Sequence, residues 1–119
     1  MHRQILVVDD NKGIREALAY RFRAMGFRVI TAVNGQMALE IVRSSWVDGI
    51  LLDFEMPVMD GLSMLQGLRK WHIHIPVLMM SADHNPEKVK KAIALGAIGF
   101  VPKPIDFARL KQQCLHIFG

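Results

Sequence analysis

Short apolar runs alternate with longer amphipathic segments along this chain. The runs predict five strands, at residues 5–8, 27–31, 49–52, 77–80 and 99–101. Two of them are nearly continuous in apolar residues, which is typical of strands covered by helices on both faces. Strands that alternate with helical segments indicate successive βα units around a parallel sheet.

The segments between the runs carry helical spacing and helix boundary signals. Four apolar residues recur at helical spacing and are followed by a glycine stop: Ile14, Leu18, Phe22, Met25 and Gly26. We expect the next two helices at residues 36–42 and 62–70, the second one capped by Asp60. Asn85 and Asp106 are predicted N-caps of the last two helices. The pattern therefore predicts an α/β fold.

The length and composition are those of one globular domain, which we expect to span residues 1–119. Apolar residues make up 51% of the chain and charged residues 22%. No apolar run approaches the roughly 18 residues that a membrane span requires, and the N-terminus lacks a secretory signal. We therefore expect a cytoplasmic protein without membrane contact. Cys114, the single cysteine, is predicted to be a buried, inert thiol.

The formal net charge of +4 does not by itself indicate nucleic acid binding. The fifteen Lys and Arg residues are scattered, with no run longer than the pair Lys90 and Lys91. We therefore expect a solvated basic surface and no direct nucleic acid partner. Acidic residues, in contrast, gather where the predicted strands end.

Three aspartates follow predicted strands directly. Asp9 and Asp10 come after the first strand, and Asp53 comes after the third. Ligands of open α/β sheets bind at the carboxyl ends of the strands, so these carboxylates are expected to meet. Crowded carboxylates require a neutralising cation, and oxygen ligands favour Mg²⁺, which in turn suggests phosphate chemistry.

Two further strand ends supply groups suited to a phosphoryl ligand. Ser81 follows the fourth strand with a hydroxyl donor, and Lys103 follows the fifth with a cation. Phosphoryl transfer requires mainly positioning and charge neutralisation, which acids, metal, hydroxyl and lysine can supply together.

These residues and spacings resemble those of a CheY-like response-regulator receiver domain. The resemblance covers residues 4–118 and is carried by residues 5–10, Leu52-Asp53, Met56-Pro57-Val58-Met59-Asp60-Gly61, Ser81-Ala82, and the segment from Gly96-Ala97 to Lys103-Pro104. It implies a flavodoxin-like doubly wound (βα)₅ domain. Its five-stranded parallel sheet would have the order 2-1-3-4-5, with helices on both faces.

The resemblance also implies a role for each site residue. Asp53 would be the phosphoacceptor, with Ser81 and Lys103 binding the phosphoryl oxygens. Asp10 and Asp53 would bind Mg²⁺ directly, Asp9 mainly through water, and Glu55 through its backbone carbonyl. By the same resemblance, the Lys103-Pro104 bond is expected to be cis, and Phe100 takes the aromatic position that moves inward with the Ser81 hydroxyl.

The implied function is a phosphoacceptor switch of a two-component phosphorelay. A histidine kinase or phosphotransfer protein would donate the phosphoryl group from a phosphohistidine. The switch would change the surface formed by the helix after Asn85, the strand at 99–101 and the helix after Asp106. Slow self-catalysed transfer and autodephosphorylation, rather than conventional enzyme activity, are expected.

The sequence does not determine the downstream target of the switch. The chain ends just after the last predicted helix, which leaves no room for a DNA-binding effector. We therefore expect output through a protein partner, or a domain of a longer regulator. A phosphorylation-linked homodimer is left open.

Three alternative functions remain open besides the signalling switch. A Mg²⁺-dependent aspartyl-phosphate phosphatase usually has a second Asp two residues after the nucleophile, where this chain has Glu55. A flavin carrier needs a phosphate loop after the first strand, where the acidic pair at 9–10 would repel phosphate. The third is a receiver that binds partners without phosphorylation, and the intact set of Asp10, Asp53, Ser81 and Lys103 argues against it. Within the switch, we expect Glu55 and Asp83 to tune the phospho-lifetime.

Overall fold

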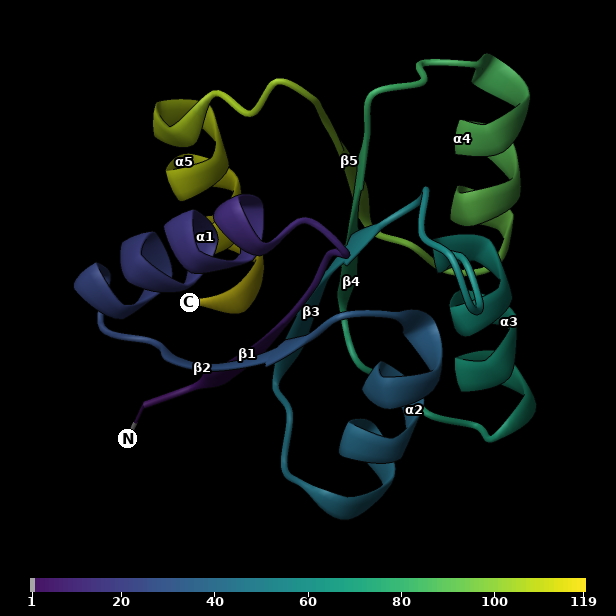
Figure 1. The fold of residues 1–119 in the computed structure, drawn as a ribbon, viewed down its shortest axis with the longest axis horizontal. Helices are drawn as coiled ribbons and strands as arrows, with labels where there is room; N and C mark the ends of the chain where they lie inside the picture. The colour runs from purple at the N-terminus through teal and green to yellow at the C-terminus, as the bar shows by residue number, and fades with distance from the viewer. Residues whose placement is uncertain (1) are drawn as a thin grey trace.

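Five strands and five helices alternate strictly along the chain in the computed structural model, which describes residues 2–119 (Figure 1). The strands are β1 (Gln4–Val8), β2 (Arg28–Ala32), β3 (Gly49–Asp53), β4 (Val77–Ser81) and β5 (Gly99–Pro102). The helices are α1 (Lys12–Ala24), α2 (Gly35–Ser44), α3 (Gly61–Lys70), α4 (Pro86–Ala94) and α5 (Phe107–Phe118). All strand pairs are parallel, in the order β2-β1-β3-β4-β5. The predicted doubly wound fold and strand order are confirmed.

Helices cover both faces of the sheet. Helices α1 and α5 pack on one face, and α2, α3 and α4 pack on the other, as Figure 1 shows. In β1, Ile5 and Val7 face the α1/α5 side, whereas Leu6 and Val8 face the opposite side. All four side chains are fully buried, which explains why this strand is a continuous apolar run rather than an alternating one.

The strand boundaries differ from the predicted ones by single residues. Strands β3 and β4 extend through Asp53 and Ser81, which pair with Met80 and Pro102 of the neighbouring strands. The two functional candidates therefore belong to the sheet itself rather than to loops. Strand β2 starts after Phe27, because the Phe27 N–H donates to the Phe22 carbonyl oxygen (3.1 Å) and closes the end of α1.

The predicted N-caps are confirmed by hydrogen bonds from the first turns of their helices. The Asp60 side chain accepts from the Ser63 N–H at 2.8 Å, and the Asn85 side chain accepts from the Glu87 N–H at 2.9 Å. Asp106 accepts from two N–H groups of α5. Each cap satisfies donors that the helix itself leaves unpaired.

The connection from β3 to α3 is tightly fitted beneath the end of β3. The Gly61 N–H donates to the Phe54 carbonyl oxygen at 3.0 Å, and a Cβ at Gly61 would collide with the Asp53 carbonyl oxygen. Val58 and Met59, within this connection, have φ of 53° and 70°, an unfavourable region for both residues and especially for β-branched valine. The fold thus accepts local strain close to Asp53.

Cys114 is fully buried among apolar side chains of the α1/α5 layer, as predicted. Among the helices of residues 2–119, none combines the length and the apolar character needed to cross a lipid bilayer.

Candidate functional site

The three aspartates meet at the carboxyl edge of the sheet. Asp9 and Asp10 follow β1, and Asp53 ends β3, which is the neighbour of β1 in the sheet. One carboxylate oxygen from each of the three residues lies within 4.8 Å of the others. They line an open cleft of about 460 Å³ together with Lys103 and residues of the loop after β4. The predicted convergence of strand ends is confirmed.

Two of these carboxylates are buried. Asp9 and Asp53 are 0% and 1% exposed, whereas Asp10 lies at the surface. The pKa of Asp53 is raised to about 7, because burial and, to a smaller extent, the charge of Asp9 raise it by more than Lys103 lowers it. A buried carboxylate beside another anion favours its protonated form unless a cation is close.

Lys103 supplies a cation at the centre of the cluster. Its Nζ lies 2.9 Å from Asp9 Oδ2 and 3.2 Å from Asp53 Oδ1. Burial lowers the pKa of Lys103, but the hydrogen bond to Asp9 and the charges of Asp53 and Asp9 outweigh this effect, so the pKa is raised. Lys103 is therefore charged at neutral pH.

The backbone around Lys103 and Asp9 holds both side chains in place. The Lys103 N–H donates to the Ser81 carbonyl oxygen at 2.9 Å, and the Lys103-Pro104 bond is cis, as expected. Asp9 Oδ1 accepts from the Asn11 N–H at 2.9 Å, so both of its carboxylate oxygens have partners. The Arg15 guanidinium also donates to the Asp9 carbonyl oxygen at 2.9 Å.

Ser81 lies beside the cluster, but its hydroxyl is engaged elsewhere. The buried Oγ donates to Glu55 Oε1 or to the Asp83 carbonyl oxygen, 2.9 Å away, and it accepts from the Asp83 N–H at 3.0 Å. A hydroxyl has one proton, so it donates to one of the two acceptors at a time. The expected contact of Ser81 with a phosphoryl oxygen therefore stays a prediction, and it requires this hydroxyl to turn.

Sequence reasoning missed Lys88, which links α4 to the site. Its Nζ lies 3.1 Å from Asp83 Oδ2 and 3.8 Å from Glu55 Oε1. The hydrogen bond with Asp83 raises the pKa of Lys88 and lowers that of Asp83. No motif marks a lysine one turn into a helix, so only the packing of α4 beside the β4–α4 loop identifies it.

Phe100, the predicted mobile aromatic residue, is half-buried in this structure. Its ring packs edge-on against Phe54 and His84, with ring centroids 6.4 and 6.0 Å apart. The same Phe54 ring lies 5.8 Å from Lys88 Nζ. An aromatic cluster thus joins the residues next to Asp53 with β5 and α4.

The donor set of the site fits Mg²⁺. Three carboxylates face a single lysine within the cluster, so negative charge is in excess and the available donors are oxygens. Within residues 2–119, this is the only group of at least three acidic, histidine or cysteine side chains with converging ligand atoms. His72 and His74 lie between α3 and β4, and histidine is a common metal ligand, but both are exposed and belong to no such group.

The sequence matches known proteins over nearly its whole length. Residues 5–115 match the family model described as the response regulator receiver domain. The chain is 34% identical to sporulation initiation phosphotransferase F of Bacillus subtilis, over 94% of this chain and 90% of that protein. It is 36% identical to the regulatory protein AtoC of Escherichia coli, but the match covers 96% of this chain and only 25% of AtoC. The chain thus spans about a quarter of the length of this longer relative.

Solved structures agree with the fold. The chemotaxis protein CheY4 of Vibrio cholerae superposes with a TM-score of 0.92 at 29% identity, covering 98% of this chain and 99% of CheY4. The response regulator protein TrrA of Thermotoga maritima, solved in complex with Mg²⁺ and BeF, has a TM-score of 0.86 at 31% identity. That match covers 97% of this chain and 98% of TrrA.

Proposed function

The chain belongs to the response regulator receiver domain family and is a phosphoacceptor switch of two-component signalling, and we propose that Asp53 is the residue that accepts the phosphoryl group. One observation carries this proposal: Asp53 is the buried last residue of β3, with the Lys103 ammonium 3.2 Å from its Oδ1. Among the described residues, its second oxygen, Oδ2, takes part in no hydrogen bond or ion pair. This oxygen is therefore the nucleophile that the geometry favours.

The proposed donor is the phosphohistidine of a histidine kinase or phosphotransfer protein. A lone pair of Asp53 attacks phosphorus and forms a P–O bond, while the P–N bond of the donor breaks. The electron pair of that bond returns to the ring nitrogen. An imidazole protonated at its other nitrogen leaves as the neutral ring, so no further proton donor is needed.

Lys103 and Ser81 are proposed to bind the transferred group. Lys103 already contacts Asp53 and can neutralise charge on a phosphoryl oxygen without a large movement. Ser81 must release Glu55 and Asp83 before its hydroxyl can donate to another phosphoryl oxygen. The turn of Ser81 would thus couple phosphorylation to the loop after β4.

The carboxylates of Asp9, Asp10 and Asp53 and the backbone carbonyl of Glu55 are proposed to hold Mg²⁺. When bound, the ion would neutralise these carboxylates and the charge of the phosphoryl oxygens. The Glu55 side chain is turned toward Ser81 and Lys88, which leaves its backbone oxygen as its contribution to the ion.

The phosphoryl group is proposed to leave by slow hydrolysis. Water attacks phosphorus, the P–O bond to Asp53 breaks, and its electron pair returns to the Asp53 carboxylate. Both protons of the water end on the released inorganic phosphate, which can then lose one to solvent. Glu55 and Asp83 are placed to influence this step, because both contact the Ser81 hydroxyl.

The output surface is proposed to be α4, β5 and α5. Lys88 and Phe100 connect α4 and β5 to residues next to Asp53, which gives a physical route for a change at the site to reach this surface. The binding partner of this surface would be a downstream protein or an effector domain.

The central test is incubation with Mg²⁺ and acetyl phosphate, read by intact mass. We expect the wild type to gain one phosphoryl group and Asp53→Asn to gain none. Asp106→Asn is the matched control, since it removes a carboxylate at an α5 cap where asparagine also serves well. No gain in the wild type, or a gain in Asp53→Asn, would refute the assignment.

A further inference from the structure

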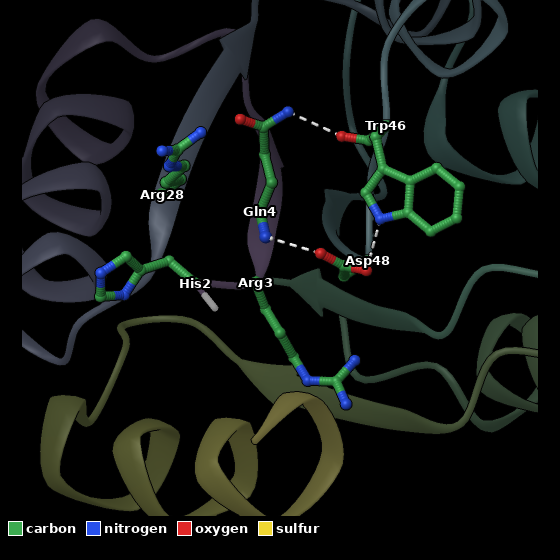
Figure 2. Close-up of a pocket in the computed structure, with 6 residues that line it drawn as sticks. All are labelled: His2, Arg3, Gln4, Arg28, Trp46 and Asp48. Carbon is green, nitrogen blue, oxygen red and sulfur yellow. Dashed lines mark hydrogen bonds between the residues drawn. The ribbon is translucent and has the colours of Figure 1, made fainter.

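A second cleft lies at the opposite end of the sheet, where the strands begin. It has a volume of about 550 Å³ and is lined by the start of β1, the start of β2 and the connection that precedes β3 (Figure 2). Its lining residues are His2, Arg3, Gln4, Arg28, Trp46 and Asp48. The volume is in the range of ligand pockets, and no part of the phosphorylation site reaches it.

A hydrogen-bond network fixes one wall of this cleft. The Trp46 indole N–H donates to Asp48 Oδ1 at 2.8 Å, and the Gln4 backbone N–H donates to Asp48 Oδ2 at 2.8 Å. The Gln4 side chain donates to the Trp46 carbonyl oxygen at 2.6 Å. Trp46 is therefore held in one orientation although its side chain is exposed.

Trp46 is unusually exposed for a large, mainly apolar side chain. The residue is 79% exposed, and the polar end of the indole is already used by Asp48, so its apolar ring faces solvent. Tryptophan and arginine are the residue types enriched among interface residues whose truncation costs most binding energy. A pre-oriented, solvent-facing ring is ready to pack against an apolar side chain of a partner.

The cleft has an excess of unpaired positive charge. Arg3 and Arg28 are exposed, and within residues 2–119 neither guanidinium forms an ion pair or a hydrogen bond. Asp48, the one acid in the lining, has both carboxylate oxygens occupied by Gln4 and Trp46. Figure 2 shows Arg28 and His2 on one side of Gln4 and the Trp46 ring on the other, with Arg3 below.

We propose that this cleft binds an acidic peptide segment of a partner protein, with an apolar side chain packed on Trp46 and carboxylates paired with Arg3 and Arg28. A guanidinium matches a carboxylate with two parallel hydrogen bonds. Nucleic acid fits less well, because its binding usually relies on a longer track of phosphate contacts than two arginines provide. The proposal concerns a site apart from Asp53 and goes beyond the phosphoryl transfer proposed above.

The test begins with selection from a random peptide library displayed on phage, using the full chain as bait. Counter-selection against an Arg3→Ala, Arg28→Ala, Trp46→Ala variant removes peptides that bind elsewhere. We expect enriched sequences in which Asp or Glu flank a Leu, Phe or Trp. No enrichment, or enrichment of neutral or basic sequences, would overturn the proposal.

Binding of an enriched peptide is then measured by Trp46 fluorescence in a Trp71→Phe background, where Trp46 is the only tryptophan. We expect Arg3→Ala or Arg28→Ala to weaken binding by about tenfold or more. Arg109→Ala, which removes an exposed charge on α5, should leave binding unchanged. Thermal unfolding midpoints close to wild type establish that the variants are folded.

A last measurement tests whether the cleft binds nucleic acid instead of an acidic peptide. A thymidine oligonucleotide is titrated in the same assay, with the same variants. If it binds, if the arginine variants weaken that binding, and if acidic peptides do not bind, the cleft is a nucleic acid site and the proposal is wrong.

Discussion

Oε1 of Glu55, a residue two positions after Asp53 in the chain, is one of the two acceptors within hydrogen-bond distance of the Ser81 hydroxyl. In this arrangement, the hydroxyl expected to bind a phosphoryl oxygen is held by a carboxylate. The same Glu55 oxygen lies 3.8 Å from Lys88 of α4. A phosphoryl group on Asp53 must therefore compete with Glu55 for the Ser81 hydroxyl.

Glu55→Ala should accelerate phosphorylation of Asp53 by acetyl phosphate. The change removes one of the two acceptors of the Ser81 hydroxyl, and it removes a negative charge near the incoming donor, while the backbone carbonyl proposed to bind Mg²⁺ remains. A hydrogen bond to a charged group contributes about 1.5–3 kcal/mol, part of which has to be lost when Ser81 turns, so we expect an increase of roughly threefold to tenfold. Initial rates by intact mass provide the measurement. Glu87→Ala, an exposed acid of α4, should have no effect, and an unchanged or slower rate in Glu55→Ala would contradict the proposed competition.

Lys88→Ala should have the opposite effect on the rate. Lys88 neutralises Asp83 and Glu55, so its loss leaves more negative charge beside the site, and we expect phosphorylation to slow by roughly two- to fivefold. The stability change should be small, since these ion pairs are partly exposed. Lys90→Ala is the matched control, because Lys90 pairs with Glu87 on the same helix. Equal rates in the two variants would rule out a role for Lys88.

Mg²⁺ should stabilise the protein, and Asp10 should be needed for this effect. At free Mg²⁺ about tenfold above its dissociation constant, binding linkage predicts roughly 1.4 kcal/mol of added stability. The measurement is the thermal unfolding midpoint in Mg²⁺ and in EDTA. Asp10→Asn should show little difference between the two, whereas Asp106→Asn should respond like wild type. A full response in Asp10→Asn would remove that residue from the metal site.

Cys114 should make stability fall at high pH. Burial raises the pKa of Cys114 from 9.0 to about 12, so between these values the unfolded thiol ionises while the folded one stays protonated. Ionisation therefore favours the unfolded state as pH rises from about 9 toward 12. Cys114→Ala lacks this dependence, so the stability difference between wild type and variant should shrink by roughly 1 kcal/mol from pH 7 to pH 10. Urea unfolding at both pH values tests this, and a constant difference would contradict it.

Gly61→Ala should destabilise the fold near the site. The added methyl group would meet the backbone of Asp53 and Phe54, which cannot yield without displacing the end of β3. We expect a loss of about 1–3 kcal/mol, measured by urea unfolding. Gly67→Ala, on the same helix, meets only the flexible Leu39 side chain and should change stability by less than about 1 kcal/mol. Similar losses in the two variants would show that helix packing in general, not the contact with Asp53, is responsible.

The elements and the converging strand ends could be predicted because their signals are local. Asn85 and Asp106 mark helix starts by their own side chains, and Asp53 and Lys103 come together because parallel strands end at one edge. The extension of β4 through Ser81 shows the limit of such reasoning, since strand ends depend on pairing with neighbours. The predicted strand boundaries were accordingly wrong by single residues, and the helix predicted at 36–42 extends from Gly35 to Ser44.

Features that depend on side-chain contacts between distant segments could not be predicted. The sequence indicated that Glu55 would influence the phospho-lifetime, but not that its carboxylate would hold Ser81. Lys88 reaches the site only because α4 packs beside the loop after β4. Trp46 and Arg28, 18 residues apart, likewise carry no shared motif and meet only in the folded cleft.

Because every strand runs in the same direction, the two ends of the sheet have different chemistry. β1 spans the distance between them, with Gln4 in the basic cleft and Asp9 at the acidic one, roughly 17 Å away at the usual rise per strand residue. A phosphodonor at one end and an acidic peptide at the other would not compete for space. A ternary complex is thus sterically allowed, and in it this small domain would act as an adaptor that is modified at one end while it is tethered at the other.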